Sequence, residues 1–265
     1  MEKRKLLNLG CGNRYHKDWV NMDFTSRNKN IISHNILKGI PFPDSYFDAV
    51  YHSHVLEHFS KADAFKFIRE CYRVLKPGGI IRIAVPNLES IVENYKKYLK
   101  MAIKGDEIAE ANYDWSMIEM YDQCVRSSSG GEMRKYLSQD NIINKEFITS
   151  RIGTFANFSQ NSNEKKENKV KNLAKEIIRF IKKVGRIIPG QKNWTIGKFR
   201  MSGETHQWMY DRFSLSRLLR NEDFNNPTIT NAYNSMIIGW SEFNLDADKE
   251  GKIFKPDSLF MEAIK

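Results

Sequence analysis

The alternation of short apolar runs with helical patterns over the first ninety residues constrains the fold most. Apolar residues recur at helical spacing from Ala64 to Leu75, after a helix-start pattern at Ser60 and before the breaker Pro77-Gly78-Gly79. Strands separated by helices favour a parallel sheet built from βα units. Five short strands are predicted in this part, at Lys5–Leu9, Trp19–Phe24, Ile31–Ile32, Phe47–Tyr51 and Ile80–Val85.

The middle of the chain has a different pattern. Residues 90–200 are mostly polar with helical spacing and contain no convincing strand. Regular patterning returns near Thr205, where Ser214–Leu219 predicts a helix and Thr228–Ile238 and Ser258–Ile264 predict two closing strands. An α/β core interrupted by a mainly helical insertion is therefore expected.

Domain limits follow from these shifts in pattern. We expect residues 1–98 to form the first part of the core, 99–199 the insertion, and 200–265 the remainder of the core. Within the insertion, Ser127–Gly131 predicts a flexible break and Gln160–Lys171 a polar linker.

Composition narrows the class of protein. The 265 residues contain no apolar run near the roughly 18 residues that span a bilayer, and the start lacks the apolar stretch of a signal peptide. Cys11, Cys71 and Cys124 are too few and too scattered for a disulfide framework, so a cytoplasmic protein is expected.

The net charge of +10 is local. Residues 164–192 contain ten basic and three acidic residues, whereas the remainder contains 32 and 29. The core is therefore close to neutral, and nucleic acid is not the expected partner.

A glycine turn follows the first predicted strand. Gly10 and Gly12 allow the backbone to pass close to a nucleotide-type ligand. The dinucleotide pattern requires a third glycine where this chain has Tyr15, and an acid about 20 residues further on. Here Asp23 follows Gly12 by only 11 residues, which favours a ligand without a pyrophosphate.

Six motifs occur in an order that resembles class I S-adenosylmethionine (SAM)-dependent methyltransferases of the type-11-like group. The resemblance implies a Rossmann-like seven-stranded sheet with an antiparallel last strand, and SAM as cofactor. The motifs are Leu7-Asn-Leu-Gly-Cys-Gly-Asn13, Val20-Asn-Met-Asp23, Ile40-Pro-Phe-Pro-Asp44, Phe47-Asp-Ala-Val50, His54-Val-Leu-Glu-His58 and Arg73-Val-Leu-Lys-Pro-Gly-Gly79.

The resemblance also implies roles for individual residues. Gly10 and Gly12 would let the backbone run close to the methionine part of SAM. Asp23 would hold the ribose hydroxyls, and Asn35 would face the adenine. This chain departs from the family at Asn8 and Asn35, where the family often has acids. The full set of expected cofactor-binding residues is Asn8, Gly10, Cys11, Gly12, Asp23, Asn35, Ile36, Ser53 and His54.

Histidines are the candidate bases. Methyl transfer to a hydroxyl or amine requires an in-line approach and removal of a proton, which suits an imidazole. We expect His206, just before the last predicted helix, to lie at the acceptor site as the catalytic residue, with His54 as a second candidate. For His58, a helix-start or packing role is the preferred interpretation.

The segment His54-Val-Leu-Glu57-His58 also matches the H-x-x-E-H signature of inverted zinc peptidases. On a helix both imidazoles would share one face, with Glu57 beside them as the base. Zinc would need a third protein ligand, for which Glu70, Glu89 and Glu93 are available. Because the methyltransferase group has the same five residues here, no metal is expected, and a metallopeptidase is the less favoured alternative.

The insertion is expected to cover the acceptor, since loops at the carboxyl ends of parallel strands build such sites. The candidate acceptor residues are Asp122, Gln123, Arg126, Trp208 and Tyr210. This part resembles bacterial methyltransferases associated with polysaccharide or nucleotide-sugar chemistry, which implies a sugar hydroxyl as acceptor.

Two other functions remain open. An RNA methyltransferase is disfavoured, because the chain has neither an added RNA-binding module nor an Asn/Asp-Pro-Pro-Tyr/Phe site after the fourth strand. A non-catalytic SAM-fold binding protein is disfavoured by the intact Gly10, Gly12 and Asp23.

Residues 170–188 have the most regular helical pattern in the chain, with apolar residues at i, i+3 and i+4 and basic residues between them. Two interpretations are open: a helix packed on the core, or a helix lying on an anionic membrane surface. The second would place the protein at the inner face of the membrane.

Overall fold

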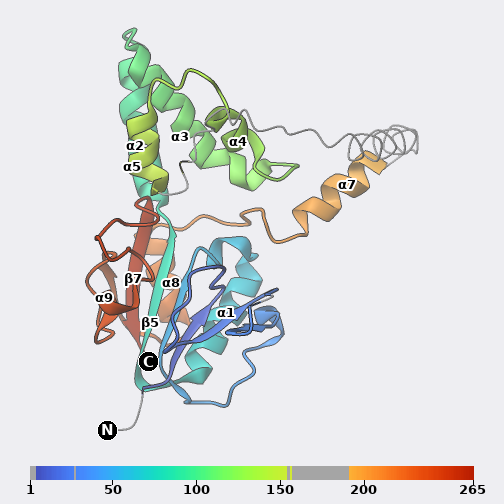
Figure 1. The fold of residues 1–265 in the computed structure, drawn as a ribbon, viewed down its shortest axis with the longest axis vertical. Helices are drawn as coiled ribbons and strands as arrows, with labels where there is room; N and C mark the ends of the chain where they lie inside the picture. Colours follow the sequence, from blue (N-terminus) through green and yellow to red (C-terminus); the bar gives the residue numbers. More distant parts are fainter. Residues whose placement is uncertain (1–3, 27, 154–155, 157–190) are drawn as a thin grey trace.

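One seven-stranded sheet organises the protein (Figure 1). The computed structural model describes residues 4–26, 28–153, 156 and 191–265. The strand order is β3-β2-β1-β4-β5-β7-β6; β1 to β5 are parallel, and β7 is antiparallel to both neighbours. The predicted Rossmann-like sheet is confirmed. Its strands are β1 (Leu6–Leu9), β2 (Val20–Asp23), β3 (Ile31–Ser33), β4 (Phe47–Ser53), β5 (Leu75–Pro86), β6 (Asn225–Thr230) and β7 (Ser258–Ile264).

Helices α1 and α8 cover one face of this sheet, and helices α2, α3, α4 and α5 stand beyond its carboxyl edge (Figure 1). The helices are α1 (Lys61–Val74), α2 (Leu88–Ala102), α3 (Glu107–Val125), α4 (Gly131–Leu137), α5 (Lys145–Ile152), α7 (Gln191–Arg200), α8 (Arg212–Asn221) and α9 (Trp240–Phe243), with short 3-10 helices η1 (Ile36–Lys38) and η2 (Leu56–His58).

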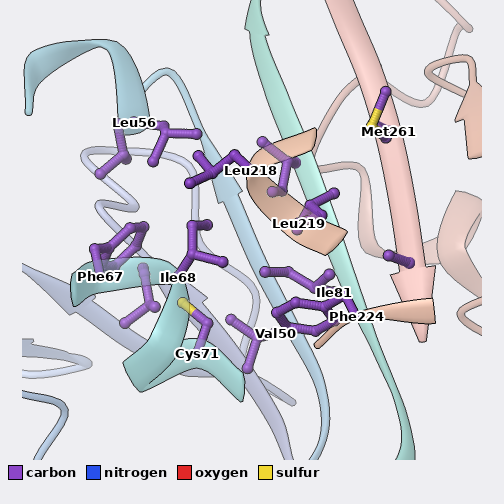
Figure 2. Packing of buried hydrophobic residues seen from close by; sticks show 14 of the residues in the cluster. Val50, Leu56, Phe67, Ile68, Cys71, Ile81, Leu218, Leu219, Phe224 and Met261 are labelled. Atoms are coloured by element: carbon purple, nitrogen blue, oxygen red, sulfur yellow. The ribbon is translucent and has the colours of Figure 1, made fainter. Parts of the chain in front are cut away.

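The main hydrophobic core lies between the sheet and helices α1 and α8. Phe67, Ile68 and Cys71 of α1 and Leu219 of α8 pack with strand residues such as Val50 (Figure 2). Helix α1 begins as predicted, because the Ser60 side chain accepts a hydrogen bond from the Asp63 amide at 3.1 Å. The spacing of the apolar residues thus fixes the face of α1 that meets the sheet.

An irregular segment, not a long helix, covers the opposite face. Arg82 of β5 is fully buried there, and its guanidinium contacts Asp246 at 2.8 Å and Glu262 at 2.7 Å. It also donates to the backbone oxygens of Asn231 and Asn234. One cation therefore fastens the segment 231–246 to the sheet.

The predicted strand Thr228–Ile238 is wrong beyond Thr230, and the strand begins earlier, at Asn225. Pairing with β7 ends at Thr230, and the chain then turns. The Asn231 side chain accepts from the amides of Tyr233 and Asn234, which forms a local turn that competes with strand pairing.

The insertion has a small core of its own, formed by Trp115, Ile142, Ile148 and Ile152. The expected boundary between residues 98 and 99 falls inside α2, which begins directly after β5. The predicted linker Gln160–Lys171 and basic helix 170–188 lie outside the described residues. Among the helices that the structure describes, none is both long and apolar enough to cross a membrane.

Replacing the buried cation Arg82 should destabilise the folded protein. We expect Arg82→Met to lower the free energy of unfolding by about 3–5 kcal/mol, since Asp246 and Glu262 would remain buried without their partner. Urea unfolding measures the change. The control is Arg217→Met on the exposed side of α8, which should cost less than about 0.5 kcal/mol. Equal losses in the two variants would contradict the role assigned to Arg82.

Candidate active site

The glycine turn after β1 has the backbone geometry that its sequence predicts. Gly10 and Gly12 have φ angles of +63° and +53°, which L side chains rarely adopt. A Cβ on Gly10 would lie 2.3 Å from Val55 Cγ2, whereas a Cβ on Gly12 would meet no atom within 4 Å. Gly10 is therefore required by packing, and Gly12 leaves open space above the backbone.

Asp23 lies beside this turn, at the carboxyl end of β2. Its Oδ2 accepts a hydrogen bond from the Gly12 amide at 2.8 Å. The Asn8 side chain is buried below the turn and donates to Arg14 O and to Asn21 Oδ1. Asn8 thus holds the turn together, and Gly12 and Asp23 border the open space.

The other expected cofactor residues also follow the ends of β1, β3 and β4. The Asn35 side chain caps η1 by accepting from the Leu37 amide, and Ile36 packs against the main core. Burial raises the pKa of the Cys11 thiol to about 12, and Asp23 adds to the shift. Cys11 is therefore protonated at neutral pH, which excludes a thiolate at this turn.

His54 follows β4 in a left-handed conformation with φ +55°. Its amide donates to Ala84 O of β5, and its ring lies between two polar groups. Nε2 is 2.8 Å from Ser258 Oγ, and Nδ1 is 3.1 Å from Glu57 Oε1. The ring is therefore held from both sides.

Glu57 is fully buried next to three imidazoles. Burial alone would raise its pKa, but His54, His206 and His58 outweigh burial and hold the pKa well below its usual value. Burial lowers the pKa of His54 to about 4, assisted by Lys255 and opposed by Glu57. We conclude that Glu57 is ionised and His54 neutral, because an N–H of a neutral imidazole stabilises a carboxylate without carrying charge.

The segment before α8 crosses this site. The backbone oxygen of Glu57 accepts from the amides of Gln207 and Trp208, and the His206 amide donates to Gln123 O of α3. The segment therefore joins η2 to the insertion. Burial lowers the pKa of His206 to about 3, with Glu57 opposing the shift.

A cavity of about 440 Å³ opens between the insertion and the carboxyl ends of β4 and β5. This volume is in the range of small-molecule sites. Its lining is rich in charged and polar side chains. These are His54, Glu119, Gln123, Arg126, Arg134, Ser138, Lys255 and Asp257.

Three of the predicted catalytic and acceptor residues line this cavity: His54, Gln123 and Arg126. Arg126 pairs with Asp122 at 2.8 Å, yet its buried Nε finds no hydrogen-bond partner among the described residues. Arg126 is thus positioned to bind a polar group in the cavity.

The remaining candidates have other surroundings and are not part of the lining. Asp122 accepts from the amides of Glu132 and Met133 at the start of α4. Tyr210 is buried in the main core, and Trp208 lies under the Lys61 ammonium. His206 packs edge-on against His58, with ring centres 4.8 Å apart.

Sequence reasoning missed Lys255 and Asp257. Both precede β7, and an antiparallel strand begins at the edge where parallel strands end, so the expected topology contained this signal. Burial lowers the pKa of Lys255 and raises that of Asp257. Glu119, also missed, pairs with Arg151 at 2.9 Å and carries no such signal in the sequence.

The zinc-peptidase geometry is absent from residues 54–58. His54 follows β4 in a left-handed conformation and only Leu56–His58 form one 3-10 turn, so the two imidazoles do not share a helix face. A metallopeptidase of the H-x-x-E-H type is therefore not supported.

Comparison with known proteins agrees with this geometry. A family model described as a methyltransferase domain matches residues 15–83. These residues are therefore similar to a methyltransferase domain. The match begins just after the glycine turn and ends within β5.

Two curated proteins are similar to this domain. A probable S-adenosylmethionine-dependent methyltransferase of Mycolicibacterium smegmatis is 32% identical over 101 residues, covering 32% of this chain and 38% of its own length. A ubiquinone/menaquinone biosynthesis C-methyltransferase of Vibrio cholerae is 39% identical over 62 residues, covering 22% of this chain and 23% of its own. The chain therefore spans less than two fifths of either relative.

Among solved structures, a SAM-dependent methyltransferase from Archaeoglobus fulgidus aligns with 99% of this chain and 86% of its own. The sequence identity is 14% and the TM-score is 0.39.

The similarity to a methyltransferase domain implies S-adenosylmethionine as cofactor, and the residues present fit it. The space above Gly12 admits a ligand against the bare backbone, and Asp23 places a carboxylate beside that space. A carboxylate in this position suits vicinal ribose hydroxyls, which donate hydrogen bonds.

The two glycines should differ in their effect on stability. Gly10→Ala combines backbone strain with the Val55 overlap and should lower the free energy of unfolding by about 2–4 kcal/mol. Gly12→Ala should cost about 1–2 kcal/mol, from backbone strain alone. Urea unfolding without ligand measures both. Adding Val55→Ala should reduce the cost of Gly10→Ala in a double-mutant cycle; equal costs or zero coupling would contradict the packing argument.

Proposed function

We propose that the chain is a SAM-dependent methyltransferase that transfers a methyl group to a sugar hydroxyl of a glycan or nucleotide-sugar precursor. The observation that carries this proposal is the meeting of two sites at consecutive residues. Val55 packs against Gly10 of the glycine turn, and His54 lines the cavity below the insertion. A cofactor at the turn and an acceptor in the cavity would thus be neighbours.

S-adenosylmethionine would supply a methyl group on a positively charged sulfur. Gly10, Gly12 and Asp23 would bind and orient it, with Asn35 and Ser53 as further candidates. The insertion would cover the acceptor and exclude water, which favours transfer to the acceptor over hydrolysis.

His54 is the residue placed to accept the hydroxyl proton. With its proton on Nδ1, facing Glu57, the lone pair of Nε2 would accept the proton of an acceptor hydroxyl once the Ser258 hydroxyl, now 2.8 Å away, rotates aside. Glu57 would hold this tautomer and stabilise the positive charge that develops on the ring. The predicted role of His206 as base has less support, because His206 is not part of the cavity lining.

The cavity chemistry favours a small acceptor with several polar groups. Arg126, Arg134 and Lys255 offer hydrogen-bond donors, while Glu119 and Asp257 offer acceptors for hydroxyls. A sugar with a phosphate or carboxylate group would use both kinds of group. An RNA acceptor is less well matched by a site of only about 440 Å³.

Binding of the product S-adenosylhomocysteine tests the cofactor site. Asp23→Ala should weaken this binding by about 10–100-fold, because the ribose hydroxyls of the ligand would lose their hydrogen bonds to the Asp23 carboxylate. Isothermal titration calorimetry measures the affinity. The matched control Asp140→Ala, on the exposed surface of the insertion, should bind as the unmodified protein does. Absence of binding, or binding unchanged by Asp23→Ala, would refute the proposal.

Methyl uptake tests the acceptor. Purified protein with methyl-labelled SAM should label nucleotide sugars and leave total RNA unlabelled. Arg126→Met should raise the KM for a labelled nucleotide sugar by about 10–100-fold, since a bond to a charged donor is lost. Arg217→Met is the control. Label in RNA with none in sugars would instead support the RNA methyltransferase alternative.

A further inference from the structure

Three metal-ligating side chains meet beside the cavity. Glu57 and His58 belong to η2, and His206 belongs to the segment that precedes α8, almost 150 residues later. Each residue offers one ligand atom, and these atoms all lie within 4.8 Å of one another. Closed zinc sites have ligand atoms roughly 3.3 Å apart, so small side-chain rotations would complete such a site.

Glu57 gives an independent reason to expect a ligand. Its side chain is fully buried, and neither carboxylate oxygen makes a hydrogen bond of acceptable geometry with the described residues. His54 Nδ1 lies 3.1 Å from Glu57 Oε1 without the alignment of a hydrogen bond, and because His54 is neutral the contact is not an ion pair. A buried carboxylate is costly unless it is paired or coordinates a metal.

The surroundings of His58 also suit coordination. Nδ1 of His58 is 3.3 Å from the backbone oxygen of Thr205, which favours the tautomer with the proton on Nδ1. The lone pair of Nε2 is then available to a metal. Metal-binding histidines commonly donate their other N–H to a carbonyl or carboxylate in this way.

We propose that Glu57, His58 and His206 bind one divalent transition-metal ion, of which Zn²⁺ fits best. Two imidazoles and one carboxylate form a borderline donor set that zinc accepts, and three protein ligands leave a fourth position for water or another ligand. The ion would join η2 to the segment 205–208 and would neutralise the Glu57 charge.

This site differs from the H-x-x-E-H pattern in the sequence. That pattern would use His54 and His58 as ligands and Glu57 as the base. Here Glu57 is itself a ligand and His206 takes the place of His54. His54 contacts the Glu57 carboxylate but does not bind the metal. The proposal does not depend on methyl transfer, because it concerns metal binding alone.

The test is metal binding by the full-length protein after removal of bound metal. We expect one Zn²⁺ per chain by mass spectrometry of metals, with affinity measured by competition against a chromophoric chelator. Co²⁺ in its place should give the intense visible absorption of a tetrahedral site. His206→Asn and Glu57→Gln should each weaken zinc binding by more than about 100-fold, since even loss of residues that orient ligands costs 10–100-fold.

Control variants separate the proposed site from other zinc binding. His16→Asn, in the loop after the glycine turn, should keep the unmodified affinity, and His54→Gln should weaken binding less than His206→Asn does. Circular dichroism and thermal unfolding in metal-free buffer show that each variant is folded. If one of these variants does not fold, His58→Asn takes its place, because His58 is only half-buried.

Three results would overturn the proposal. One is a folded protein that binds no zinc at micromolar concentration. Another is zinc binding unchanged by both His206→Asn and Glu57→Gln. The third is loss of zinc in His54→Gln with full retention in His206→Asn, which would assign the metal to the H-x-x-E-H pair. S-adenosylhomocysteine binding, measured separately, decides the methyltransferase proposal in each case.

Discussion

The buried charge of Glu57 is the interaction on which the rest of the site depends. Its backbone oxygen holds the amides of Gln207 and Trp208, and its side chain faces His54, His58 and His206. The end of β4, the turn η2 and the segment before α8 therefore meet at one residue. Removing an anion from water costs several kcal/mol, so this arrangement requires compensation from the groups around it.

The link between the glycine turn and the cavity is a short stretch of strained backbone. His54 adopts a left-handed conformation that few residues other than glycine tolerate, and its amide bond to Ala84 O and its ring contacts hold it there. As a result Val55 turns under Gly10 while His54 faces the acceptor side. The strained backbone at His54 therefore brings the glycine turn and the cavity next to each other.

Features set by local pattern could be predicted from the sequence. The strands β1 to β4, helix α1 with its Ser60 cap, the turn at Gly10 and Gly12, and the antiparallel β7 follow from apolar spacing, from turn residues or from resemblance. Strand β5 is predicted only from Ile80, whereas it begins at Leu75 and includes the expected breaker Pro77-Gly78-Gly79. The position of Asp23 at the end of the second strand is predicted in the same way, whereas its hydrogen bond from the Gly12 amide is not.

Features set by contacts between distant segments could not be predicted. The strand expected up to Ile238 stops early because the backbone there makes other hydrogen bonds. The Asn231 side chain forms a turn, and the Arg82 guanidinium donates to the Asn231 backbone oxygen. Likewise, nothing near Glu57 in the sequence indicates that His206 will lie beside it. Such contacts depend on the finished fold, which local patterns do not encode.

The position of β7 has a consequence for folding. It lies between β5 and β6 and is the only strand in the described residues that pairs with β6. Until residues 258–264 are in place, one edge of β5 stays open and β6 has no neighbour. An open edge invites pairing with other chains. Assembly of the sheet is therefore governed by its most distant sequence contact, and the partly folded protein is prone to aggregate until that contact forms.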